Sequence, residues 1–222
     1  MPHDARPWFY ALTLLAGSLT VAIAGVQHPM LVGDGADHLA LIAATGGWRA
    51  IHWAFAAGYV AVVAGLAGLG ARHAATAGER AARIGAFTAT FGYAISLVGI
   101  LFMLGAGAAL ADAYTRAEPG LASTHTVFTY DMLHPSAQAA IRVGAAAVSL
   151  GLYAFGWGAV RGGVLPRWLG FAGVGSGVVG VVAAVVAAPD SAALVAGVAL
   201  ATAWQAVTAV VVLLGARRGS TA

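Results

Sequence analysis

An arginine and a histidine stand three residues apart at the start of one of the long apolar segments of this chain. The stretch reads Gly46-Gly47-Trp48-Arg49-Ala50-Ile51-His52-Trp53. On a helix, Arg49 and His52 share one face with Tyr59 further along. An ionisable side chain inside a membrane-spanning helix is costly in free energy unless it has a partner or a function. This stretch is therefore the first candidate for a functional site.

Other histidines of the chain are candidate metal ligands. By the topology argued below, four more lie on the same side as His52: His28, His38, His125 and His134. Neutral imidazole binds zinc, copper and haem iron, and carboxylates orient such rings from behind. The carboxylates available for this are those of Asp34, Asp37 and Asp131. No H-x-x-x-H pair is present, so the prediction rests on topology. We predict that His52 and at least one other of these histidines meet at haem b or at an ion of copper, zinc or iron.

A second arginine, Arg142, lies in the fourth apolar segment and shares a helix face with Gln138. Arginine is permanently charged and makes forked contacts with carboxylates and phosphates. Two interpretations stay open for Arg49 and Arg142. They pair with an acidic side chain, Asp112 or Asp131, or they bind an anionic ligand, which includes the propionates of a haem.

Three classes of function follow from these residues. The first is metal or haem binding, with redox chemistry or metal handling as the role. The second is a membrane enzyme or carrier for a small anionic or lipidic molecule, which uses Arg49 and Arg142 with His52 as proton acceptor. The third is a structural subunit of a larger membrane complex, or a self-associating protein, whose histidines are merely interfacial. The surroundings in each case are the lipid bilayer, and no nucleic acid is involved.

Helices that cross a membrane must position these side chains. The chain of 222 residues is 60% hydrophobic and 9% charged, with a mean hydropathy of +0.86 and no cysteine. Apolar runs of about 20 residues recur, the length needed to cross a ~30 Å hydrocarbon layer. Short alternating segments, typical of membrane β-strands, are absent from the sequence. We predict an all-α, polytopic membrane protein with one domain over residues 1–222. Its six spans are expected at about residues 7–26, 48–69, 84–111, 136–160, 168–187 and 192–215.

Two of the connections carry most of the polar residues. Residues 31–47 hold Asp34 and Asp37, either of which suits the N-cap of a short interfacial helix. Residues 112–133 form the longest polar connection. Pro135 is favourable at a helix start, so we expect the fourth span to begin there.

The arginines orient the predicted bundle. Only Arg116 falls in a loop on one side, whereas eight fall on the other: Arg6, Arg72, Arg80, Arg83, Arg161, Arg167, Arg217 and Arg218. The positive-inside rule places both termini in the cytoplasm, which requires an even number of spans.

Glycines of the fourth segment recur at seven-residue intervals, at Gly144, Gly151 and Gly158. Small residues let membrane helices approach closely, so we expect this stripe to face a neighbouring helix. The tryptophans near the span ends, Trp48 among them, are expected to anchor the protein at the membrane interface.

Two stretches resemble a known family. They are Leu41-Ile42-Ala43-Ala44-Thr45-Gly46-Gly47-Trp48-Arg49 and the turn Arg161-Gly162-Gly163-Val164-Leu165-Pro166-Arg167-Trp168-Leu169-Gly170. Both are similar to segments of a bacterial six-helix membrane family catalogued as domain of unknown function 4386. That family pairs an arginine at the second span with a "gxLPRxLG" turn before the fifth. The resemblance implies six helices and a multi-pass protein of the bacterial inner membrane. It implies no reaction, and the histidines described above are not part of its pattern.

Overall fold

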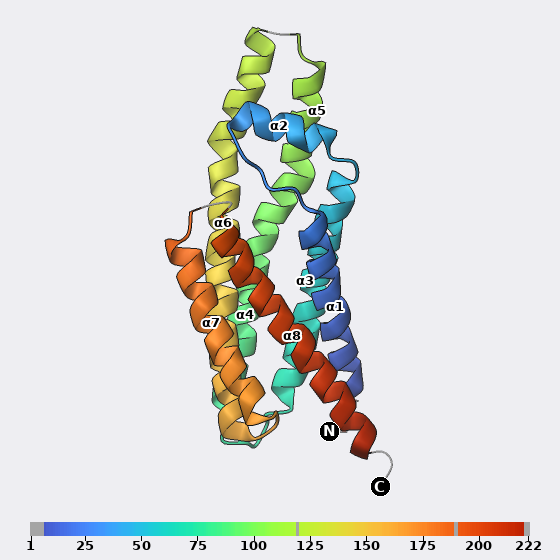
Figure 1. Cartoon of the computed structure of the whole chain (residues 1–222), viewed down its shortest axis with the longest axis vertical. Helices are drawn as coiled ribbons and strands as arrows, with labels where there is room; N and C mark the ends of the chain where they lie inside the picture. Colours follow the sequence, from blue (N-terminus) through green and yellow to red (C-terminus); the bar gives the residue numbers. More distant parts are fainter. Residues whose placement is uncertain (1–6, 119, 189–190, 220–222) are drawn as a thin grey trace.

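The regular elements of this chain are helices (Figure 1). The computed structural model describes residues 7–118, 120–188 and 191–219. Its helices are α1 (Pro7–Gln27), α2 (Gly35–Ala44), α3 (Trp48–Ala71), α4 (Glu79–Phe102), α5 (Ala108–Arg116), α6 (Leu121–Gly162), α7 (Arg167–Val186) and α8 (Ala192–Gly219). A five-residue π-helix, Met103–Gly107, joins α4 to α5. The all-helical class predicted from the sequence is confirmed.

Six helices in the described part of the chain are long and apolar enough to cross a membrane. They are α1, α3, α4 with its continuation through α5, α6, α7 and α8. Many of their large apolar side chains are exposed, as expected for surfaces that face lipid chains. This confirms the six-helix bundle of a polytopic membrane protein.

Helix α6 is much longer than the sequence indicates. With 42 residues it is about 63 Å long, roughly twice the hydrocarbon thickness. The prediction that a helix starts at Pro135 is wrong, because Pro135 lies inside α6. Residues 121–134 are helical because this stretch packs against α2 and α5, with Tyr130 fully buried between them. Helix α5 extends to Arg116, so the connection between α5 and α6 is short. The sequence had predicted a long polar connection over residues 112–133.

Helices α4 and α6 pack backbone to backbone through glycines. A Cβ atom at Gly151 would lie 2.5 Å from the Ala89 nitrogen, and one at Gly92 would lie 2.5 Å from the Val148 nitrogen. A Cβ at Gly158 would lie 2.7 Å from the Ala82 nitrogen. The glycine stripe of α6 is therefore a packing surface, as predicted.

A second, smaller hydrophobic cluster lies beyond the main bundle. Helix α2 lies across α5 and α6, both of which continue beyond it (Figure 1), and buries Leu39 and Ile42 against Trp48 and Tyr130. Asp34 caps α2, and its carboxylate accepts hydrogen bonds from the backbone N–H groups of Ala36 and Asp37. The expected short helix is thus present and held in place, and its position at the membrane interface stays a prediction. We call this end of the molecule the α2 end.

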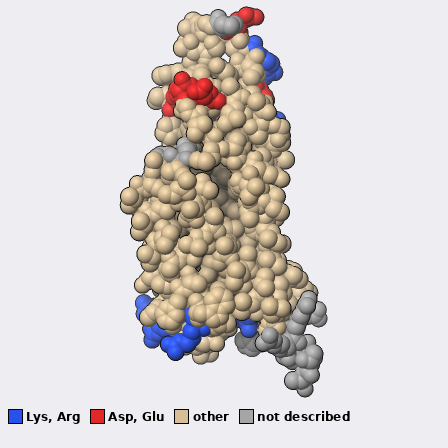
Figure 2. Space-filling view, in the orientation of Figure 1, with Lys and Arg blue, Asp and Glu red and all other residues tan. Residues whose placement is uncertain are grey.

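The charged side chains divide between the two ends of the bundle (Figure 2). The exposed arginines Arg72, Arg80, Arg83, Arg161 and Arg167 surround the end where α1 begins and α8 finishes, which we call the arginine end. The exposed acids of the α2 end are Asp34, Asp37, Asp112, Glu118 and Asp131. Arg6 lies outside the described residues. Which end of the bundle faces the cytoplasm stays a prediction.

Candidate functional site

The histidines of the α2 end lie in two pairs. The ring centroids of His28 and His52 are 5.1 Å apart, and those of His38 and His134 are 5.3 Å apart. His125 is exposed on α6, away from both pairs. Within the described part of the chain, the structure thus places His28 beside His52. It does not gather the predicted histidines into one cluster.

The first pair is packed against Trp48 at the start of α3. His52 is 1% exposed, and its Nδ1 lies 2.8 Å from the Trp48 carbonyl oxygen. A carbonyl only accepts, so the Nδ1–H of His52 donates and Nε2 keeps its lone pair. Burial, and then the electrostatic interaction with His52, lower the pKa of His28 to about 4, although a hydrogen bond with the Pro29 backbone opposes this. His28 is therefore neutral at pH 7.

Trp48 has a structural role that the sequence did not indicate. Its ring is only 4% exposed, and its indole N–H donates to the Met103 carbonyl at 2.9 Å. That carbonyl belongs to the π-helix, where the regular helical ladder is interrupted. The expectation that Trp48 is an interfacial anchor is wrong, because the side chain fills the junction of α2, α3 and the π-helix.

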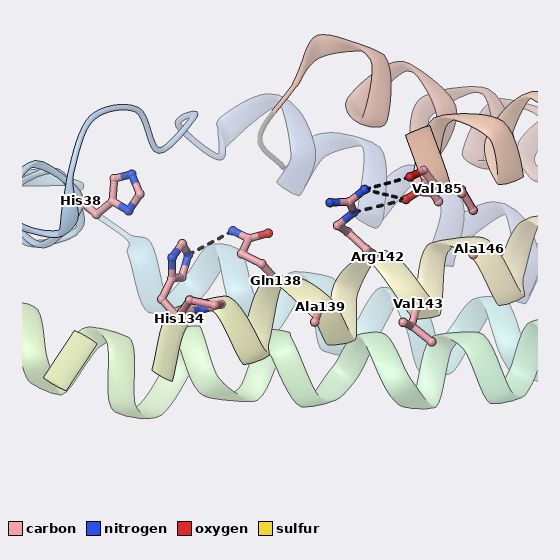
Figure 3. Close-up of a pocket in the computed structure, with 10 residues that line it drawn as sticks. His38, His134, Gln138, Ala139, Arg142, Val143, Ala146 and Val185 are labelled. Atoms are coloured by element: carbon pink, nitrogen blue, oxygen red, sulfur yellow. Dashed lines mark hydrogen bonds between the residues drawn. The ribbon is translucent and has the colours of Figure 1, made fainter. Parts of the chain in front are cut away.

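The second pair joins His38 of α2 to a polar row on α6 that begins at His134. The Tyr130 ring stacks on His134 with centroids 4.7 Å apart, and the Tyr130 hydroxyl is 3.5 Å from Nδ1 of His38. One turn further, the Gln138 amide nitrogen lies 3.0 Å from Nε2 of His134. Figure 3 shows His134, Gln138 and Arg142 in line along α6, with His38 facing them from α2.

These side chains line a groove of about 530 Å³ between α6, the end of α7 and α2. Its lining residues are His38, His134, Pro135, Gln138, Ala139, Arg142, Val143, Ala146, Ala184 and Val185. The polar side chains of α6 form one row that begins beside His38 and ends at Arg142 against the end of α7, and the apolar side chains of α6 form a neighbouring row (Figure 3). Figure 2 shows this face of the molecule hollowed at a level below α2. The groove is thus amphipathic along its length.

Arg142 binds main-chain carbonyls at the end of α7. Its Nη2 donates to the carbonyl oxygens of Ala187 at 2.8 Å, Ala184 at 3.1 Å and Val185 at 3.3 Å, and its Nε donates to Ala184 at 3.2 Å. The last carbonyls of a helix have no partner within the helix, and in an apolar environment they need one. An ion pair between Arg142 and Asp112 or Asp131 was one expectation, and the structure shows these carbonyls as partners instead.

Arg49 pairs with Asp112, which was one of its two expected partners. The Nη2–Oδ2 distance is 3.1 Å, and the two side chains are 62% and 55% exposed. Both residues line a separate hollow of about 260 Å³. Arg49 and Arg142 therefore lie in different pockets.

The remaining candidates lie apart from the groove. Tyr59 is buried in the bundle with its ring 4.8 Å from that of Tyr93, whose hydroxyl is bonded to the Gln205 amide. Asp131 is exposed and lies against Gly35 at the start of α2, where a Cβ atom would overlap its carboxylate.

The fit of these residues to a metal or haem is incomplete. Among residues 7–118, 120–188 and 191–219, no group of three or more His, Asp or Glu side chains is placed to hold a metal ion. Each histidine pair offers two ligands, whereas zinc sites use three or four protein ligands. The arginines expected to hold haem propionates contact Asp112 and the α7 carbonyls instead.

The groove could be found only in part from the sequence. His134, Gln138 and Arg142 are four residues apart, the spacing that places side chains on one helix face. The sequence hides this signal, because the preference of Pro135 for a helix start leaves His134 outside the predicted span. The contributions of Ala184 and Val185 from α7 have no local signal, since they depend on how α7 packs against α6.

No curated protein and no solved structure matches the chain. The sequence profile of the family described as domain of unknown function (DUF4386) matches residues 8–215, so the chain belongs to this family.

Proposed function

We propose that this membrane protein binds a lipid-like amphiphile in the groove between α2, α6 and the end of α7. The polar head would lie near His38, His134 and Gln138, and the apolar part would follow Ala139, Val143 and Ala146. The observation that carries the proposal is the lining of the groove, in which a row of polar side chains on α6 runs beside a row of apolar ones.

The dimensions of the groove support a small molecule as ligand. Its volume of about 530 Å³ lies within the range of roughly 300–1,000 Å³ that is usual for small-molecule sites. Such sites combine an apolar lining with a few polar groups that fix the orientation of the ligand. Here Val143 and Val185 are 56% and 67% exposed, so apolar surface is available to a ligand chain.

The polar end supplies hydrogen-bonding groups suited to a polar or anionic head. The imidazoles of His38 and His134 lie together, and the Gln138 amide is one turn away on α6. Arg142 adds a permanent positive charge to the same wall, although its guanidinium also holds the α7 carbonyls. These residues favour a head group that accepts hydrogen bonds.

A dansyl-labelled fatty acid tests this proposal. Its fluorescence should rise when it is titrated into the purified protein in detergent, because the dansyl group enters an apolar site. Ala139→Phe fills the groove and should weaken this binding at least about tenfold, which corresponds to about 1.4 kcal/mol.

Ala199→Phe is the matched control. Ala199 is an exposed alanine of α8 outside the groove lining, so this variant should bind as wild type does. Equal affinity of wild type and Ala139→Phe would overturn the proposal, as would equal losses in both variants.

A transition metal is the second candidate, and the two histidine pairs are the observation that favours it. Their ring centroids are 5.1 and 5.3 Å apart, close enough for two imidazoles to share one ion. The histidines would supply two ligands, and the ligand set would need completion from elsewhere. Metal analysis of the protein expressed with iron, copper and zinc, compared with His52→Ala and His134→Ala, separates this candidate from the first. Equally low metal content in all three proteins would exclude it.

A further inference from the structure

A second amphipathic surface lies at the opposite end of the molecule, on the first turns of α4. A hollow of about 810 Å³ is lined there by Thr76, Ala77, Glu79, Arg80, Arg83, Ile84 and Phe87. It is distinct in position and residues from the groove at the α2 end. We propose that it binds the head group of an anionic phospholipid from the adjoining membrane leaflet.

The first argument is charge. Arg80 and Arg83 are both exposed at the rim of the hollow. Glu79 offsets part of this positive charge, because its Oε1 lies 3.5 Å from Nη1 of Arg83. Its Oε2 accepts a hydrogen bond from the Ala75 N–H at 2.8 Å. Arg80 and Arg83 together carry two positive charges against one negative charge of Glu79. The hollow therefore has a net positive charge, which is complementary to a phosphate.

The second argument is the apolar stripe that starts at these arginines. Ile84, Phe87 and Phe91 follow Arg80 at helical spacing, so the four side chains share one face of α4. The three apolar residues are 51%, 74% and 57% exposed. The opposite face of α4 packs against α6 through its glycines, as described above. This stripe faces away from the bundle and is suited to an acyl chain.

A phospholipid matches both features at once. Its phosphate would lie between Arg80 and Arg83, and one acyl chain would run along Ile84, Phe87 and Phe91. Basic residues near a membrane surface each add to the attraction for anionic lipids. Free phosphate would use the arginines alone and would gain nothing from the stripe.

The test compares two lipids with identical acyl chains, phosphatidylglycerol and phosphatidylcholine. Each is added to the delipidated full-length protein in detergent, and bound lipid is counted by native mass spectrometry. Wild type should retain phosphatidylglycerol in preference to phosphatidylcholine. The double variant Arg80→Gln/Arg83→Gln should bind phosphatidylglycerol roughly tenfold more weakly, since Glu79 already offsets part of the charge.

The matched control is Arg161→Gln/Arg167→Gln, which removes the same charge from exposed positions of the arginine end outside the hollow. This control should keep the preference of wild type. Equal losses in the two double variants would overturn the proposal in favour of a general charge effect. Equal retention of both lipids by wild type would also overturn it. The proposal would also be overturned if glycerol phosphate raised the melting temperature of the protein as much as phosphatidylglycerol does. That result would show a site for free phosphate.

Discussion

Two arginines at the α2 end differ in what their guanidinium groups contact. Arg142 donates to the carbonyls of Ala184, Val185 and Ala187, which have few other partners at the end of α7. Arg49 forms an ion pair with Asp112 in which both side chains are more than half exposed. Exposed ion pairs contribute little to stability, whereas a charged donor to helix-end carbonyls in apolar surroundings contributes more.

The first prediction follows from this difference. Arg142→Met, which keeps the length of the side chain but removes its donors, should lower the free energy of unfolding by at least about 2 kcal/mol. Arg49→Met should lower it by no more than about 1 kcal/mol. Denaturation of both variants in detergent, followed by circular dichroism, measures the two effects. A melting curve of Arg142→Met that overlays wild type would show that the α7 carbonyls do not need this partner.

His28 gives the second prediction, on pH. Its pKa in the folded protein, about 4, lies below the ordinary value of 6.5, so protonation favours the unfolded state. The stability that this group contributes is present above pH 6.5 and is lost as the pH falls towards 4. Melting temperatures between pH 7 and pH 4 should therefore decline less steeply in His28→Phe than in wild type. His125→Phe, at an exposed position, should follow the wild-type curve; identical slopes for all three proteins would contradict the prediction.

At the scale of elements, the close approach of α4 and α6 fixes the wall of the groove. Gly85, Gly92, Gly151 and Gly158 allow the two backbones to touch, so α6 has a defined rotation about its axis. That rotation directs Arg142 away from α4 and towards the end of α7. The position of the polar row therefore depends on glycines of α4 and of another part of α6.

The third prediction tests this packing. Gly151→Leu should lower the free energy of unfolding by about 1–3 kcal/mol or more, because a Cβ atom alone would lie 2.5 Å from the Ala89 nitrogen. Leu150 is 52% exposed, so Leu150→Ala should have a smaller effect. Thermal melting of the two variants in detergent gives the comparison. If Gly151→Leu is as stable as wild type, the packing of α4 on α6 must be looser than the structure indicates.

At the scale of the whole molecule, the two amphipathic surfaces lie at opposite ends of the bundle. The groove of the proposed amphiphile lies at the α2 end, and the basic hollow of α4 lies at the arginine end. Under the positive-inside rule, the arginine end and both termini face the cytoplasm. The groove would then face the outer side of the membrane, and the basic hollow the inner leaflet.

The fourth prediction concerns this orientation. Gly78 precedes α4 and Glu118 follows α5, so the two residues lie at opposite ends of one long helical segment. A reporter enzyme that is active only outside the cytoplasm should be active when fused after Glu118 and inactive when fused after Gly78. The same signal from the two fusions would contradict the predicted orientation.

The sequence by itself determined the helical class and the number of helices long enough to span a membrane. Apolar runs near twenty residues long have one stable solution in lipid, because every backbone group must find its partner within the segment. The cap of α2 by Asp34 and the glycine stripe of α6 were also predictable, since both depend on residues close together in the chain. The pairing of Arg49 with Asp112 was one of two possibilities that topology allowed.

Only the tertiary structure decided which polar residues meet. Pro135 lies within α6 because Tyr130 and its neighbours bury apolar surface against α2 and α5, which outweighs the local preference of proline for a helix start. This extension of α6 brings His134 into line with Gln138, and it separates the histidines into two pairs. The partner of Arg142 is a set of backbone carbonyls, which every residue carries and no sequence pattern can mark. Long-range packing sets these contacts, and the spacing of residues along the chain does not.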